Sequence, residues 1–114
     1  MNKYRVSPPE QRRFRGKTYA SKAEMEYATI LHAMVESNAI RLVIEQPRVQ
    51  LGVPENVYVP DFFVLDSDGG HFVDVKGMET AAFRRNKKLW KAYGRAPLHI
   101  VKKSGSKFKT VEVI

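Results

Sequence analysis

The order of the periodic segments is the feature that most constrains the fold of this chain. Two segments have helical periodicity and five are rich in β-branched and aliphatic residues, in the order helix, three strands, helix, two strands. They are residues 21–37, 40–51, 57–66, 71–77, 80–93, 98–103 and 108–114. Strands interrupted by a helix in this way predict an α/β domain with a mixed central sheet flanked by helices.

The first helical segment carries an apolar stripe and signals at both ends. Ser21 followed by Glu24 has the spacing of a capping box, and Asn38 suits the C-terminal stop. The stripe consists of Ala23, Tyr27, Ile30, Leu31 and Met34. We expect a helix over 21–37 with this stripe against the core.

Turn residues and a proline indicate how the strands pair. Residues 67–70 separate the segments 57–66 and 71–77, which predicts a hairpin. Pro47 lies inside the segment 40–51, and a proline within a strand favours an edge position or a bulge.

Composition limits the class of protein. The formal net charge of +8 and the pI near 9.9 indicate a polyanionic partner, most often nucleic acid. The absence of cysteine excludes disulfide scaffolds, thiolate zinc sites and cysteine nucleophiles. No signal peptide or membrane-spanning run is evident, so we expect a cytoplasmic protein without a membrane partner. Residues 1–20 are predicted to form an extended basic arm before a domain of residues 21–114.

Three charged residues fall on the two strands of the predicted hairpin. Asp74 and Lys76 are two residues apart, so both point to one face of the sheet. A regular two-residue turn within 67–70 would pair residues whose numbers sum to an odd value. Asp61 would then share this face and lie within about one pair spacing of Asp74. A bulge in the turn would reverse this parity.

Two carboxylates and an ammonium on the covered face of a sheet are costly unless they bind something. Singly, each has a structural explanation: Asp74 can pair with Lys76, and Asp61 can serve the turn after Pro60. Together they suit Mg²⁺ or Mn²⁺, which activate water and stabilise charge on a phosphodiester. Lys76 could orient the attacking water or neutralise the developing charge. In so basic a chain, the expected reaction is hydrolysis of a nucleic-acid backbone.

The same residues carry a resemblance to a known family. Pro60-Asp61, a spacer and Asp74-Val75-Lys76 resemble the signature of the PD-(D/E)XK nuclease superfamily. Over residues 21–103 the chain is similar to the phage endonuclease I family of junction resolvases. It also resembles short phage-encoded nucleases in which an SKxExxY helix precedes PDF and DVKG strands. The resemblance implies a restriction-endonuclease-like αβββαβ core and a phage-encoded protein.

The resemblance also implies the roles of individual residues. An acid from the first helix joins the metal site; by position this is Glu24, with Glu26 as competitor because both flank the apolar stripe at similar angles. Gln46 is an accessory candidate, with a plain edge-strand glutamine as the alternative. The family has glutamate where this chain has an aspartate in its third strand, so a shorter side chain must reach the same ion. The implied catalytic residues, of which the first three are metal ligands, are Glu24, Asp61, Asp74 and Lys76.

Basic residues outside the acid cluster are candidates for phosphate contacts. The helix 80–93 follows directly after Lys76 and carries half of them; a solvated charged face is the alternative. Its aromatic residues Phe83, Trp90 and Tyr93 share one side and are predicted to be core. The DNA-binding candidates are Arg12, Arg13, Arg15, Lys17, Lys22, Arg84, Arg85, Lys87, Lys88 and Lys91.

These inferences predict an Mg²⁺-dependent DNA endonuclease selective for branched DNA, with Mn²⁺ as a substitute ion. Cutting both strands of a junction requires two sites, which favours a homodimer. Two alternatives stay open. A catalytically inactive nucleic-acid-binding module would bind independently of Asp61 and Asp74. A nicking subunit of a larger phage or transposon assembly would be a stable monomer that cuts only with its partner.

Overall fold

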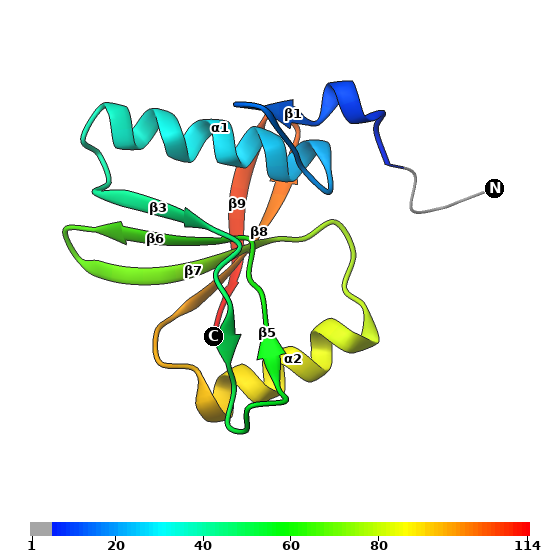
Figure 1. Cartoon of the computed structure of the whole chain (residues 1–114), viewed down its shortest axis with the longest axis vertical. Coiled ribbons are helices and arrows are strands. Elements are labelled where there is room, and N and C mark those ends of the chain that lie inside the picture. The colour runs from blue at the N-terminus through cyan, green and yellow to red at the C-terminus, as the bar shows by residue number, and fades with distance from the viewer. Residues whose placement is uncertain (1–5) are drawn as a thin grey trace.

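The computed structural model describes residues 6–114 and has two long helices packed against a central sheet (Figure 1). The helices are the 3₁₀ turn η1 (Pro9–Gln11), α1 (Lys22–Glu36) and α2 (Ala81–Tyr93). Both long helices begin at a hydroxyl cap: Ser21 Oγ accepts a hydrogen bond from Glu24 N (3.0 Å), and Thr80 Oγ1 accepts one from Phe83 N (3.1 Å). The predicted helices are therefore present.

The central sheet has five strands in the order β3-β6-β7-β8-β9. These strands are β3 (Leu42–Glu45), β6 (Phe62–Asp66), β7 (Gly69–Val75), β8 (Leu98–Ser104) and β9 (Lys107–Val113). Only β7 and β8 are parallel, because α2 connects them, and the other neighbours are antiparallel. The predicted mixed α/β architecture, compatible with an αβββαβ core, is confirmed.

Two short hairpins lie outside this sheet. Strands β1 (Arg13–Phe14) and β2 (Lys17–Thr18) form one, and β4 (Val49–Gln50) and β5 (Val57–Tyr58) form the other. The β4–β5 hairpin runs from the middle of the molecule toward α2, whereas β1 lies beside α1 (Figure 1).

The sheet separates two cores, one under each helix. Strand alternation sends Val101 to the α1 side and Ile100 to the α2 side. The α1 core comprises Tyr19, Ala28, Leu31, Ile40, Phe62, Val64, Val73 and Val101. The α2 core comprises Leu51, Tyr58, Phe83, Trp90, Leu98 and Ile100.

The prediction of an extended basic arm is wrong for the described part of residues 1–20; residues 1–5 lie outside the described range. Tyr19 is only 2% exposed and belongs to the α1 core. The Arg12 guanidinium donates hydrogen bonds to the carbonyls of Ser7 and Tyr19, each at 2.7 Å. A few aromatic side chains anchor this segment despite its polar composition.

The predicted strands 40–51 and 57–66 are each divided. Gln46 has a φ of +51° ahead of Pro47, so β3 ends there and β4 pairs outside the sheet. β3 is nevertheless an edge strand, as Pro47 indicated. Pro60 lies between β5 and β6, where a missing N–H interrupts strand pairing.

The predicted stripe of α1 is only partly correct. Leu31 is buried, but Ile30 is 43% exposed. The buried residues are Glu24, Ala28 and Leu31, spaced four and three apart, so a glutamate occupies one position of the inward face. An acid at a buried helix position that an apolar residue would normally occupy is the first structural indication of a site.

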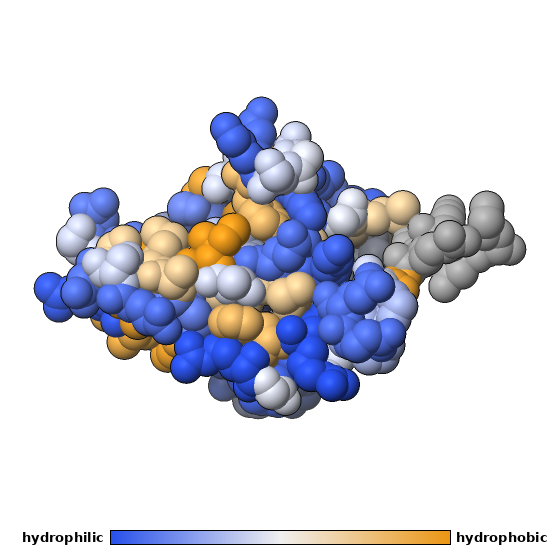
Figure 2. All heavy atoms as spheres, turned by 90° about the horizontal axis from the view of Figure 1, so that it is seen from above, coloured by the Kyte–Doolittle hydropathy of each residue, from blue (hydrophilic) through white to orange (hydrophobic). Residues whose placement is uncertain are grey.

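No helix within residues 6–114 combines the length and hydrophobicity needed to cross a bilayer. Seen from above, the surface is mainly hydrophilic, and its hydrophobic residues gather in small groups (Figure 2).

Candidate active site

Asp61 and Asp74 face each other where β6 begins and β7 ends. Phe62 pairs with Val73, so the numbers of paired residues add up to an odd value, as the hairpin pattern predicted. Asp61 N donates a hydrogen bond to Asp74 Oδ1 (3.1 Å), and Val75 N donates one to Asp61 Oδ2 (2.8 Å). The two carboxylates are thus held together by backbone donors of each other's strand.

Glu24 joins these acids from the first turn of α1. Its side chain is buried, with 6% of the residue exposed, and it forms a hydrogen bond with Asp61. Burial, followed by that hydrogen bond and the charge of Asp61, raises the pKa of Glu24 to about 8. Glu26, the competing candidate, instead binds Lys103 Nζ at 2.7 Å. Of the two glutamates, only Glu24 lies against Asp61.

Lys76 completes the group from the end of β7. Asp74 is 1% exposed, and burial raises its pKa to about 6 against the opposing effect of Lys76. Lys76 Nζ lies 3.7 Å from Asp74 Oδ2 and 4.3 Å from the centre of the Phe83 ring. The ammonium is therefore oriented by a carboxylate and by a cation–π contact from α2.

The donor set fits a hard divalent cation in its chemistry. Glu24 Oε2 and Asp74 Oδ2 are buried oxygens without a hydrogen-bond partner, and buried carboxylate oxygens rarely lack one. Within residues 6–114, however, no three acidic, histidine or cysteine side chains are arranged to hold a metal ion as they stand. Asp61 Oδ2 already accepts a hydrogen bond from Val75 N, so the three carboxylates do not form a complete set of metal ligands in this arrangement.

A second polar group beneath the site was not foreseen from the sequence. Glu45, at the end of β3, accepts a hydrogen bond from Lys17 Nζ (3.0 Å), its Oε2 lies 2.9 Å from His32 Nε2, and Tyr19 is a close neighbour. Burial and Glu45 raise the pKa of Tyr19. These residues come from three segments, and no spacing in the sequence brings them together. Their role here is to fix the first hairpin and β3 around the acids.

Gln46, the accessory candidate, meets the site through its backbone. Its N–H donates to the carbonyl of Asp61 at 2.9 Å, while the residue itself is exposed. The contact fixes where β6 begins.

The candidate DNA-binding residues divide into two groups. Arg12 and Lys17 are held by internal hydrogen bonds, and Lys87 binds Glu79 and Glu112 at 2.8 Å each. These three therefore have structural partners within the protein, and their role in DNA binding stays a prediction. Arg15 lies 4.0 Å from Glu36, a weak surface pair. The exposed remainder comprises Arg13, Lys22, Arg84, Arg85, Lys88 and Lys91.

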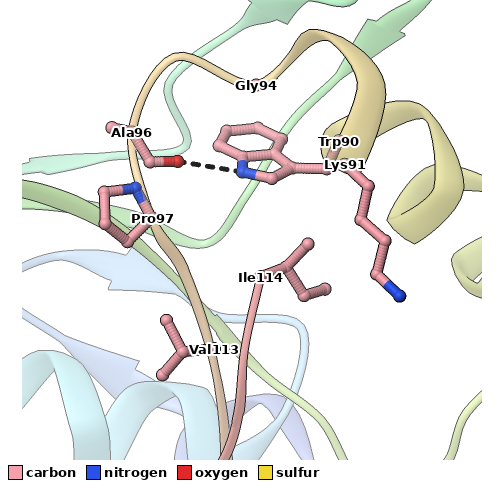
Figure 3. A pocket seen from close by; sticks show the side chains of 7 residues that line it. All are labelled: Trp90, Lys91, Gly94, Ala96, Pro97, Val113 and Ile114. Atoms are coloured by element: carbon pink, nitrogen blue, oxygen red, sulfur yellow. Dashed lines mark hydrogen bonds between the residues drawn. The ribbon is translucent and has the colours of Figure 1, made fainter.

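The aromatic side of α2 is also divided. Phe83 and Trp90 are buried as predicted, with 5% and 2% exposed, but Tyr93 is 51% exposed. The indole N–H of Trp90 donates to the carbonyl of Ala96 at 2.9 Å, across the turn that follows the helix (Figure 3). Tyr93, at the last helical position, lies beyond the core that the helix covers.

Comparison with known proteins places the chain in a family. None of the curated proteins searched matches the sequence. A family model described as "Protein of unknown function (DUF1064)" matches residues 1–110, nearly the whole chain. The chain therefore belongs to the DUF1064 family.

Proposed function

We propose that this protein is a divalent-metal-dependent endonuclease that hydrolyses DNA phosphodiester bonds. The observation that carries the proposal is the convergence of Glu24, Asp61 and Asp74, from α1, β6 and β7, on a buried point beside Lys76. Two buried acids beside a half-buried third destabilise a fold at neutral pH unless a cation or substrate uses them. The formal charge of +8 supports a polyanionic substrate.

The residues that would hold Mg²⁺ or Mn²⁺ are Asp74, Glu24 and Asp61, the first two through their unpartnered oxygens. When bound, such an ion supplies Lewis-acid activation of water and charge stabilisation at the phosphate. The chain's own contribution is positional: backbone donors fix the two aspartates, and the ammonium of Lys76 provides a fixed positive charge for a phosphate oxygen or attacking water.

Selectivity for branched DNA, a homodimeric assembly, a phage origin and action in the cytoplasm of the host complete the proposal. They rest on the resemblance of the Pro60-Asp61 and Asp74-Val75-Lys76 motifs to junction resolvases. The exposed basic residues of α2 suit backbone contacts, which read DNA shape rather than sequence. Sedimentation of the purified protein tests the dimer directly.

The decisive experiment incubates the protein with four-way junction, duplex and single-stranded DNA in Mg²⁺, Mn²⁺ or EDTA. Asp74→Asn and Lys76→Ala should abolish cleavage, whereas Asp68→Asn, which changes an exposed acid in the β6–β7 turn, should cleave as wild type does. Metal-independent binding with no cleavage by any form would favour an inactive binding module. Cleavage that is unaffected by Asp74→Asn would exclude this site.

A further inference from the structure

A second feature of the surface lies at the C-terminal end of α2. A hollow of about 530 Å³ is lined by Gln50, Gly52, Tyr93 and Arg95. Tyr93 is 51% exposed, which is unusual for a tyrosine on the aromatic side of an amphipathic helix. The hollow thus presents an aromatic ring, a guanidinium and an amide together.

The position of the Tyr93 ring is fixed by a glycine. Gly52 has a φ of +83°, and a Cβ built on it would lie 3.0 Å from Tyr93 Cε2. The β4–β5 loop can therefore pass against the ring only because residue 52 has no side chain. The ring has a backbone support while half of its surface stays in solvent.

Arg95 belongs to the turn after α2, whose residues Gly94 and Ala96 are labelled in Figure 3. The bond from the Trp90 indole to Ala96 closes this turn, and a Cβ on Gly94 would lie 2.5 Å from Trp90 Nε1. Arg95, between these two residues, is exposed. The sequence from 80 to 111 contains no aspartate or glutamate, and the acid of the β4–β5 loop is Glu55.

The β4–β5 hairpin connects the hollow to the segment that carries Asp61. Gln50 pairs directly with Val57 in the β4–β5 hairpin. Val57 precedes Asp61 by four residues, so their Cα atoms are at most about 14 Å apart, the span of a fully extended chain. The hollow and the acid cluster are therefore built in part on one continuous segment, from Gln50 to Asp61.

We propose that Tyr93 and Arg95 form a subsite for an unpaired DNA nucleotide, with the base stacked on the ring and a flanking phosphate on the guanidinium. Exposed aromatic rings beside cations are the usual means of binding single-stranded nucleic acid. The inference rests on the proposed DNA substrate and deepens it, because it requires unpaired nucleotides near the bond that is cut.

The test measures binding rather than cleavage. Fluorescence anisotropy in EDTA compares wild type, Tyr93→Phe and Tyr93→Ala on two labelled duplexes, one fully paired and one with a bulged 2-aminopurine. Tyr93→Ala should bind the bulged DNA about 5- to 150-fold more weakly, the range expected for loss of one base stack. It should bind the paired duplex as wild type does. Tyr93→Phe should retain tight binding and quench the 2-aminopurine fluorescence.

The outcomes separate this subsite from the proposed nuclease. Equal binding of the bulged DNA by wild type and Tyr93→Ala, or an equal loss on both duplexes, would overturn the subsite; so would a wild-type protein that binds neither DNA. Thermal melts exclude misfolding as the cause of a loss. Tyr93-dependent binding without cleavage in Mg²⁺ would reject the nuclease and keep the subsite. If the protein cleaves DNA but Tyr93→Ala binds the bulged DNA as wild type does, the subsite is rejected and the proposed nuclease is kept.

Discussion

Glu24 shows most clearly how a single residue departs from what the fold requires. The N-terminal cap of α1 uses only the backbone N–H of Glu24, which donates a hydrogen bond to Ser21 Oγ. The side chain is buried beside Asp61, with the backbone of Ala20 as another polar neighbour and one oxygen unpartnered. A glutamine would fit the same helix without that electrostatic cost. The proposed metal site accounts for this acid, whereas the cap of α1 does not require it.

Glu24→Gln and Glu26→Gln form a matched pair of variants, two residues apart on one helix. Glu24→Gln should lower the cleavage rate more than about 100-fold, because loss of a ligand removes several kcal/mol of charge stabilisation. Glu26→Gln removes only a surface pair with Lys103 and should cleave at close to the wild-type rate. Single-turnover rates on the same DNA decide the matter. Equal losses in both variants would remove Glu24 from the site.

The raised pKa of Glu24 gives the metal-free protein a characteristic pH dependence. Between its usual value of 4.5 and about 8, the folded state holds a proton that the unfolded state has lost. The free energy of unfolding should therefore fall from pH 7 to 8, by at most about 1.4 kcal/mol per pH unit. Urea unfolding in EDTA should show this slope in wild type and lose it in Glu24→Gln. A flat wild-type profile would contradict the raised pKa.

The first hairpin is an element whose importance only the structure makes apparent. Tyr19 follows β2 and is a buried member of the α1 core. Tyr19→Ala should lower the free energy of unfolding by about 3–5 kcal/mol, as truncation of a large buried aromatic does. Arg13→Ala, an exposed change in the same hairpin, should change it by less than about 0.5 kcal/mol. Denaturant unfolding in EDTA separates them; equal stabilities would restore the view of this segment as a loose arm.

Helix α2 provides the test of electrostatic DNA binding. Replacing Arg84, Arg85 and Lys88 by glutamine removes three exposed charges. If each contacts a phosphate, the slope of log K against log salt should become less steep by about 0.9 per contact. Lys87→Gln is the control, because Lys87 is engaged with Glu79 and Glu112 and should leave the slope unchanged. Salt titrations of duplex binding in EDTA measure this, and an unchanged slope in the triple variant would assign α2 to the solvated surface.

Elements and sites differ in how far the sequence could predict them. Asp61 and Asp74 could be placed together because strands have a period of two and the hairpin turn is short. Glu24 could not be separated from Glu26, since their angles to the helical stripe are similar and only the packing of α1 decides. The exposure of Tyr93 was missed because helical periodicity does not show where the covering sheet ends. Contacts across the chain, such as Tyr19 with Glu45, leave no local signal.

At the scale of the whole molecule, the carboxylates of Glu24, Asp61 and Asp74 repel one another within an otherwise basic protein. This acid cluster joins α1 to the β6–β7 hairpin, so its electrostatics bear on how firmly the α1 core is closed. A cation bound only by the folded state stabilises it by mass action and also relieves this repulsion. Measuring whether a cation raises the stability of the protein therefore tests the proposed site without an assay for cleavage.

Mg²⁺ or Mn²⁺ should raise the melting temperature of the wild-type protein, with an effect that grows with ion concentration. At 100 times the dissociation constant the gain is about 2.7 kcal/mol, which corresponds to about 10 °C in a domain of this size. In EDTA, Asp74→Asn should melt at or above the wild-type temperature, because it removes a buried charge; added ion should then have little effect. Asp68→Asn should respond as wild type does. If the ion raises the melting temperature of wild type and Asp74→Asn equally, it binds elsewhere, and the buried oxygens of Glu24 and Asp74 need another explanation.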